Sequence, residues 1–254
     1  MHIRLDEKQN NDEIDKLARA FNEMMSRIDS SYKQQKEFTD NASHELRTPV
    51  TRISMQIQNL ISNGSHSEKT LHYLHSILED SNQMADTISS LLLLSKIDSG
   101  YSPEFLPPCR LDEVIFEAVQ FISKEYPDAH TVFNIENESE NDLDFEIKGD
   151  YNLLKTVFIN LFKNAYLYSS DKSIKINVVQ SDGRLKVMVT NNGEIIDQED
   201  RENLFQAFAR GKNSKNIQGT GLGLRITERI LHYHHGEISY EAISPHTNCF
   251  TLSF

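Results

Sequence analysis

The sequence predicts a multidomain protein of the α and α+β classes, in which a long helical hairpin precedes a mixed α+β domain. Apolar residues recur at steps of three and four through most of residues 12–98, which is the spacing of a packed helix face. After a segment with Gly and Pro at 98–108, β-branched runs are mixed with further helical stretches, as in an α+β layer fold. The length of 254 residues also fits about two domains.

The helical region is expected to form two helices with a short turn between them. One apolar stripe runs from Phe38 to Leu60, and Asn63 and Gly64 then end the helix, with Ser67 as the N-cap of the next one. Two long helices joined by a short turn form an antiparallel hairpin. Because one hairpin cannot bury both of its apolar stripes, the sequence predicts that two chains pair into a four-helix bundle.

The second region is expected to combine helices and strands that do not alternate strictly. The segments with helical periodicity are 111–126, 150–168, 199–207 and 222–235. The segments rich in β-branched and aromatic residues, which predict strands, are 131–135, 174–179, 185–190, 237–240 and 250–254.

Composition excludes several classes of function. The chain has 26 Lys and Arg against 38 Asp and Glu, a net charge of −12, so nucleic acid is not expected as a direct partner. The longest uninterrupted apolar run, 91–94, is far too short to cross a bilayer, and the first residues lack a secretion signal. Cys109 and Cys249 match neither a disulfide framework nor a zinc motif, so a reducing compartment is expected.

A first chemical motif, SHELRTP at residues 43–49, lies within the first predicted helix. His44 is two positions from Leu46 of the apolar stripe, so it is expected to point away from the buried seam. A neutral imidazole is a nucleophile at pH 7, and the Glu45 carboxylate beside it can orient or accept the other ring proton. The alternative is a solvated His–Glu pair next to a kink at Pro49.

Three further motifs contain residue types that bind ligands. Asn160 and Asn164 share one helix face in the segment NLFKNA, and their carboxamide oxygens suit Mg²⁺. The segment NNG at 191–193 ends a predicted strand, and its glycine allows close approach of a ligand to the backbone. The segment GTGLGL at 219–224 opens a helix, where free N–H groups attract phosphate.

The residues before GTGLGL are polar and basic. This lid segment, residues 209–218, carries Arg210, Lys212 and Lys215, and it is expected to form a mobile lid over phosphates. Taken one at a time, the paired asparagines, the NNG turn and the glycines also fit ordinary caps and turns.

In this order and spacing, the motifs closely resemble those of the sensor histidine kinases of bacterial two-component systems. SHELRTP is similar to the phosphoacceptor H box of that family, NLFKNA to its N box, NNG to its G1 box, LFQAF at 204–208 to its F box and GTGLGL to its G2 box. The resemblance covers nearly the whole chain. It implies the end of a HAMP linker at 1–31, a dimerisation and histidine phosphotransfer hairpin at 32–100, and an ATP-binding α/β sandwich of the GHKL (HATPase) type at 101–254.

The resemblance implies an ATP-dependent kinase that phosphorylates itself on His44 and passes the phosphoryl group to an Asp in the receiver domain of a response regulator. Glu45 is then the base that polarises the imidazole, Thr48 orients water in a reverse phosphatase reaction, and Asn164 binds Mg²⁺. The implied nucleotide-binding residues are Asn160, Asn164, Tyr168, Asn191, Gly193, Arg210, Lys212, Gly219, Thr220, Gly221, Leu222 and Gly223. The family also implies a homodimer, and a cytoplasmic portion of a bacterial inner-membrane sensor whose anchor lies upstream of this chain.

Three positions depart from the family pattern. Asn191 stands where the G1 box usually has Asp, Ile195 replaces the second G1 glycine, and Leu167 replaces a basic residue that usually follows the N-box asparagine. They leave open an alternative, a nucleotide-binding dimeric scaffold with weak or no kinase activity. A relative of chaperone or topoisomerase ATPases is a further alternative, although such proteins lack a phosphoacceptor histidine.

Overall fold

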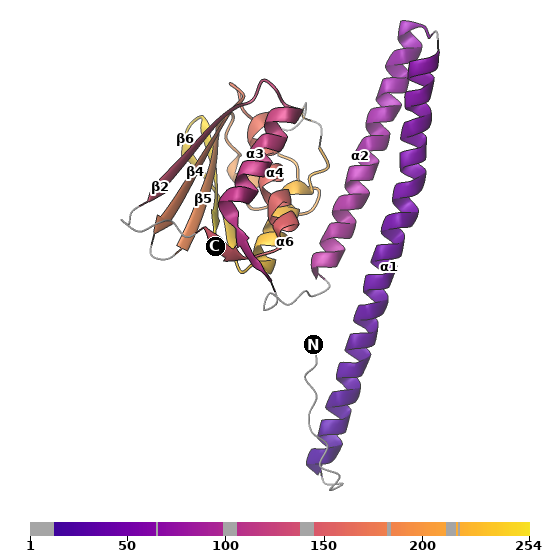
Figure 1. Ribbon diagram of the computed structural model, residues 1–254, viewed down its shortest axis with the longest axis vertical. Coiled ribbons are helices and arrows are strands. Elements are labelled where there is room, and N and C mark those ends of the chain that lie inside the picture. The colour runs from indigo at the N-terminus through magenta and orange to yellow at the C-terminus, as the bar shows by residue number, and fades with distance from the viewer. Residues whose placement is uncertain are drawn as a thin grey trace. The chain divides into compact units, whose positions relative to one another are not determined.

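The structure is a computed structural model that describes residues 13–64, 66–98, 106–137, 145–181, 184–211, 217 and 219–254. The chain divides into two compact units, Met1–Ser99 and Gly100–Phe254. The first, the helical unit, is a pair of long helices. The second, the sheet unit, is a mixed sheet with helices on one face (Figure 1). The predicted fold class is therefore confirmed.

The helical unit is a hairpin of α1 (Glu13–Asn63) and α2 (Glu68–Asp98). α1 continues through Pro49 as one helix. The hydroxyls of Ser54 on α1 and Ser81 on α2 are 3.0 Å apart and hydrogen bond across the hairpin. Among the described residues, no helix combines the length and the apolar character that a membrane span requires.

The turn between the two helices confirms the predicted stop and cap. α1 ends at Asn63, and the Ser67 hydroxyl accepts a hydrogen bond from the Thr70 N–H at 3.2 Å, as an N-cap does. His66 adds an interaction that the sequence pattern did not predict. Its Nε2 lies 2.7 Å from the Leu60 carbonyl oxygen and satisfies one of the carbonyl groups left open at the end of α1.

The hairpin covers only part of its apolar surface. Among the side chains that the structure describes here, the buried apolar ones are Val50, Ile57 and Ile97. The exposed large apolar side chains of the two helices are Leu17, Met24, Leu46, Ile53, Met55, Leu60, Tyr73, Ile77, Met84 and Leu91. A single hairpin therefore leaves apolar side chains open to solvent, as the sequence predicts.

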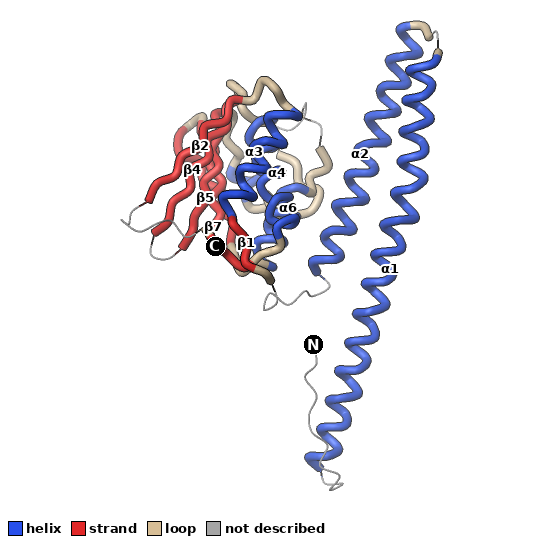
Figure 2. Tube along the Cα trace, viewed as in Figure 1, coloured by secondary structure: helices blue, strands red, loops and turns tan. Residues whose placement is uncertain are grey.

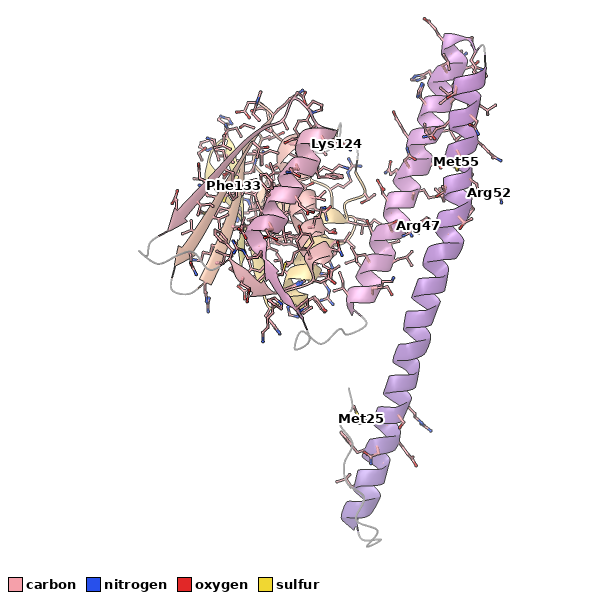
Figure 3. All side chains as sticks on the ribbon, viewed as in Figure 1. Met25, Arg47, Arg52, Met55, Lys124 and Phe133 are labelled. Carbon is pink, nitrogen blue, oxygen red and sulfur yellow. The ribbon has the colours of Figure 1, made fainter. Side chains whose placement is uncertain are left out.

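The sheet unit is built on a five-stranded sheet in the order β2-β4-β5-β7-β6 (Figure 2). Its strands are β2 (His130–Asn137), β4 (Ser173–Ser181), β5 (Arg184–Asn192), β6 (Glu237–Ser244) and β7 (Thr247–Ser253). β2 pairs with β4 in parallel, and the other neighbours are antiparallel. All five predicted strands are present. β2 forms one edge of the sheet and carries the exposed Phe133 (Figure 3).

A second, two-stranded sheet was not predicted. β1 (Pro108–Arg110) and β3 (Glu146–Lys148) pair antiparallel just before α3 and α4. Strands of three residues are too short to display the alternation of apolar and polar positions on which a strand prediction depends.

Helices α3 (Leu111–Glu125), α4 (Tyr151–Leu167) and α6 (Gly223–Tyr233) lie on the same face of the large sheet (Figure 1). The core between the layers contains fully buried side chains of α4, such as Leu154 and Phe158, and alternate residues of the central strands. Burial of one such side chain stabilises the fold by about 1.5–3 kcal/mol. The core therefore fixes the position of α4, which carries the N-box residues.

The helix predicted at 199–207 is wrong over most of its length. α5 spans only Gln198–Arg201. Turns follow it, and one of them is closed by a 2.9 Å hydrogen bond from the Gln206 N–H to the Asn203 carbonyl oxygen. Phe208 then has a φ of 64°, in the left-handed region. That conformation does not continue a right-handed helix.

Candidate functional site

The start of α4 is fixed by a cap and by a bond to the end of α6. The Asp150 carboxylate accepts hydrogen bonds from the N–H groups of Asn152 at 2.9 Å and Leu153 at 3.1 Å. The Asp150 N–H in turn donates to Nε2 of the buried His234 at 2.9 Å. Burial lowers the pKa of His234, so its neutral form, which can accept this bond, is favoured. The bond to His234 fixes the start of α4 against the end of α6.

The middle of α4 lies beside the first turn of α6. Asn160 Nδ2 donates a hydrogen bond of 3.4 Å to the Gly223 carbonyl oxygen, and a Cβ atom at Gly223 would lie 3.7 Å from the Asn160 Cγ. Asn164 lies one helical turn further along the same face and is half-buried. Its carboxamide makes no hydrogen bond within the part of the chain that the structure describes. The N-box and G2-box segments are thus neighbours.

The end of α4 is joined to the end of β5. Asn191 is buried, with 5% of its surface exposed, and its Nδ2 donates to the Tyr168 carbonyl oxygen at 3.2 Å. A Cβ atom at Gly193 would lie 2.1 Å from that same carbonyl oxygen, so this position admits only glycine. The Ser170 N–H also donates to the Asn192 carbonyl oxygen at 2.7 Å. The predicted residues Tyr168, Asn191 and Gly193 therefore form one group.

Asp171 supports this junction, although the sequence motifs did not include it. Its carboxylate accepts hydrogen bonds from Asn192 Nδ2 at 2.9 Å, from the Ser169 hydroxyl at 2.8 Å and from the Ser173 N–H at 3.0 Å. These bonds hold the pKa of the Asp171 carboxyl well below its usual range. An Asp two residues before the start of a strand in a serine-rich turn is a signal that could have predicted this role.

Phe208 directly precedes the lid segment, Gly221 follows it by three residues, and the two are hydrogen bonded to each other. The Phe208 N–H donates to the Gly221 carbonyl oxygen at 3.0 Å, a contact that we name the lid neck. Gly221 has a φ of 70°, and a Cβ atom there would lie 2.8 Å from the Ala209 carbonyl oxygen. Around a Cβ atom at Gly219, by contrast, no atom lies within 4 Å. The motif contains both glycines, but only Gly221 is required by the local backbone.

The structure describes some, but not all, of the remaining residues predicted around the lid. The Arg210 guanidinium donates to the Ile217 carbonyl oxygen inside the lid segment. Lys212, like the other lysine of that segment, lies outside the described residues. The Thr220 hydroxyl accepts a hydrogen bond from the Leu222 N–H at 3.3 Å, and the Leu222 side chain is fully buried. Leu222 can therefore reach a ligand only through its backbone.

The predicted nucleophile motif lies on α1, in the other unit. Thr48 is exposed, two residues before the buried Val50. The backbones of His44 and Glu45 belong to the helix, and their side chains lie outside the described residues.

Two family models match the chain, one in each unit. The "His Kinase A (phospho-acceptor) domain" matches residues 34–100, and the "Histidine kinase-, DNA gyrase B-, and HSP90-like ATPase" matches residues 149–254. Together the two models cover more than half of the sequence. The chain belongs to the sensor histidine kinases. The family prediction is thereby confirmed.

Two relatives of this sensor histidine kinase each align with both the helical unit and the sheet unit. It is 29% identical over 247 residues to the heme sensor protein HssS of Staphylococcus haemolyticus, an alignment that covers 95% of this chain and 52% of HssS. It is 30% identical over 238 residues to the signal transduction histidine-protein kinase ArlS of Staphylococcus aureus, which covers 92% of this chain and 51% of ArlS. The chain thus spans about half the length of these relatives.

Solved structures agree on the fold of this sensor histidine kinase. The histidine kinase AdeS of Acinetobacter baumannii superposes with a TM-score of 0.56 at 22% identity, over 83% of this chain and 96% of that chain. ShkA, solved in complex with AMPPNP, superposes with a TM-score of 0.65 at 19% identity, over 85% of this chain and 45% of that chain. At these identities, the likeness supports the fold alone.

Proposed function

We propose that this chain is the autophosphorylating part of a sensor kinase. It binds ATP in the sheet unit, transfers the γ-phosphoryl group to His44 and then donates that group to an Asp in the receiver domain of a response regulator. Because ATP is the phosphoryl donor, a cytoplasmic location is part of this proposal. Fractionation of cells that express the full-length protein tests the location.

One observation carries the proposal. Two groups of contacts lie on α4, one around Asn160 and Gly223 and the other around Tyr168 and Asn191. Asn160 and Tyr168 are eight residues apart in sequence, which corresponds to about 12 Å along a helix. This separation supports an elongated ligand, with its phosphates near the start of α6 and its base near Asn191. The free N–H groups at the start of a helix favour phosphate at the first position.

The proposed transfer uses the residues of α1 as the acceptor. An imidazole nitrogen of His44 forms a bond to the γ-phosphorus while the bond from that phosphorus to the β,γ-bridging oxygen breaks, and ADP leaves. Glu45 polarises the imidazole and stabilises the positive charge that develops on it. Arg210 and the backbone N–H groups of the glycine-rich segment neutralise charge on the phosphates.

We infer that Asn164 is a ligand of Mg²⁺. A carboxamide oxygen is a hard ligand of the kind that Mg²⁺ prefers, and no hydrogen bond among the described residues occupies the Asn164 side chain. When bound, Mg²⁺ supplies positive charge to the phosphates. Asn164→Ala should therefore remove the Mg²⁺ dependence of ATP binding, as measured by titration calorimetry with and without the metal.

We further propose that the helical unit pairs with a second copy. Leu46, Ile53 and Leu60 lie at helical spacing on α1 and are each about half exposed within one chain. Coverage of such a stripe by the same stripe of a second hairpin forms a four-helix bundle. The response regulator is expected to bind the same bundle, where it reaches the phosphorylated His44.

A labelling experiment tests the function. The chain is incubated with γ-labelled ATP and Mg²⁺, beside a His44→Gln variant. Acid-labile label is expected on the wild type and not on the variant, since phosphohistidine is acid-labile. Label that persists in the variant would refute His44 as the acceptor. If the wild type binds ATP and takes up no label, the nucleotide-binding scaffold becomes the better account.

The transfer and phosphatase steps need a second experiment. Labelled chain is mixed with an isolated receiver domain, and the label is expected to move to that domain. Thr48→Ala is expected to slow the later loss of label from the receiver domain while leaving autophosphorylation intact. Unchanged dephosphorylation in this variant would show that Thr48 does not orient water.

A further inference from the structure

We propose that Lys163 is the cation of α4 that binds the nucleotide phosphates, in place of the basic residue usual in the family at the position of Leu167. The inference rests on the proposed function, because it concerns the same nucleotide site. It concerns a residue of the NLFKNA segment to which the resemblance assigns no role.

Helix geometry places Lys163 on the correct side of α4. Lys163 and Leu167 are four residues apart, so they are neighbours on the helix surface. Asn160 and Asn164 belong to the same stretch of surface, since residues three and four apart share a face. Asn160 contacts the first turn of α6 through the Gly223 carbonyl oxygen. A cation at position 163 is therefore next to the proposed phosphate and Mg²⁺ positions.

The length of a lysine side chain compensates for the shift along the helix. One helical turn is about 5.4 Å, and the flexible four-carbon stem of lysine extends a comparable distance. Leu167 itself is half-buried and apolar, so it offers phosphate no charge. A lysine one turn earlier can thus deliver its ammonium group to the region that a basic residue at 167 would serve.

Lys163 forms no ion pair among the described residues, unlike Lys155 and Arg225. Lys155 forms an ion pair with Glu117 at 2.6 Å, and Arg225 forms one with Glu228 at 2.6 Å. Lys163 is exposed, and among the described residues it makes neither a hydrogen bond nor an ion pair. Its ammonium group can bind a phosphate without breaking an interaction.

The test compares ligands that differ in phosphate number. Affinities of Lys163→Ala for a nonhydrolysable ATP analogue, ADP and adenosine are measured by calorimetry on the whole chain with Mg²⁺. A charged hydrogen bond is worth roughly 1.5–3 kcal/mol, so a loss of roughly tenfold or more is expected for the ATP analogue. The loss should be smaller for ADP and absent for adenosine. Lys175→Ala, an exposed lysine of β4, is the matched control.

A rescue variant separates charge from structure. Lys163→Ala combined with Leu167→Lys restores a cation at the family position, and it should recover most of the affinity for the ATP analogue. Equal affinities of wild type and Lys163→Ala, or an equal loss for adenosine, would overturn the inference while leaving the proposed function intact. If the wild type binds no nucleotide, the proposed function fails, and this inference fails with it.

Discussion

The helical unit and the sheet unit bury their apolar residues to different degrees. In the sheet unit, Leu154 and Phe158 of α4 are 0% exposed. In the helical unit, Leu46 and Ile53 of α1 are each 46% exposed. The sheet unit thus completes its core within one chain, whereas the hairpin carries apolar surface that one chain does not cover. The stability of the first should not depend on protein concentration, and that of the second should.

The two units also differ in how they position chemistry. In the sheet unit, hydrogen bonds between elements hold the candidate ligand residues, as Asn191 is held to Tyr168 and Asn160 to Gly223. On α1, by contrast, His44 is positioned by its place in a continuous helix. A substitution in the sheet unit is therefore expected to act through local contacts, while one on the open stripe of α1 is expected to act through the proposed pairing of two chains.

The largest effect is expected from truncation of the sheet core. Phe158→Ala should lower the free energy of unfolding of the sheet unit by about 3–5 kcal/mol, because it removes a fully buried ring and leaves a cavity. Urea denaturation followed by circular dichroism measures the change. Phe116→Ala on α3, where the ring is 62% exposed, should change stability by no more than about 0.5 kcal/mol. Equal losses in the two variants would contradict this description of the core.

Charge on the open stripe of α1 should weaken pairing of the chains. Ile53→Asp is expected to raise the dissociation constant of the dimer by at least about tenfold, since a carboxylate would be buried between two hairpins. Sedimentation at several protein concentrations measures the shift.

Asn59→Asp is the control for this effect, because it adds the same charge outside the stripe. Asn59 is exposed. It follows Arg52 by seven residues and so shares its helix face, and Arg52 projects away from α2 (Figure 3). The control should leave association nearly unchanged. A dimer that tolerates Ile53→Asp would show that this stripe has another role.

A smaller effect is expected at the lid neck. Gly221→Ala should cost about 1–2 kcal/mol, because it places a side chain in the left-handed region and against the Ala209 carbonyl oxygen. Thermal unfolding of the sheet unit measures the cost. Gly219→Ala should leave stability unchanged, since a Cβ atom there meets open space. If Gly219→Ala nevertheless weakens ATP binding, the loss reports contact with the ligand.

The smallest effect is a pH dependence in the sheet unit. Burial lowers the pKa of His234 below its unfolded value of about 6.5, so the unfolded chain binds a proton more readily. Stability should therefore fall as the pH decreases through the unfolded pKa. Protonation would also oppose the hydrogen bond from the Asp150 N–H to Nε2, although the Asp150 carboxylate favours the charged ring and His235 disfavours it.

His234→Gln checks that this residue is responsible. A glutamine carboxamide oxygen can still accept from the Asp150 N–H but does not titrate in this range. Urea denaturation between about pH 7 and about pH 5 should show a shallower decline in the variant than in the wild type. The same slope in both proteins would assign the pH dependence to other groups.

The sequence was sufficient to predict those features of the fold that depend on a few adjacent residues. Asn63 and Ser67 predicted the hairpin turn, because helix stops and caps depend on a few adjacent residues. The contact between Asn191 and Tyr168 was not predictable in the same way, since 23 residues separate them in sequence. Phe208 gave no signal of its left-handed backbone, which is uncommon in a bulky residue. The helix predicted at 199–207 failed before this residue, because turns such as the one closed by the Gln206 N–H and the Asn203 carbonyl oxygen follow Arg201.

The motifs of the candidate site were recognisable in the sequence, but the contacts that their residues make in the fold were not. Matching residue types to the family motifs singled out Asn160, Gly193 and Gly221. It did not distinguish Gly221, which the backbone requires, from Gly219, which has free space around it. It also passed over Asp171, whose bonds to the turn before β4 exist only once the strands are assembled.

The lid neck has a consequence for how such kinases diverge. Because Phe208 and Gly221 are hydrogen bonded to each other, the rest of the sheet unit depends on the closeness of these two ends and not on the length of chain between them. The entropic cost of closing a loop grows slowly, by about 0.6 kcal/mol for each doubling of its length. Insertions and deletions in the lid segment should therefore be inherited at little thermodynamic cost, so that the length of this segment can vary between paralogues while the surrounding fold is retained.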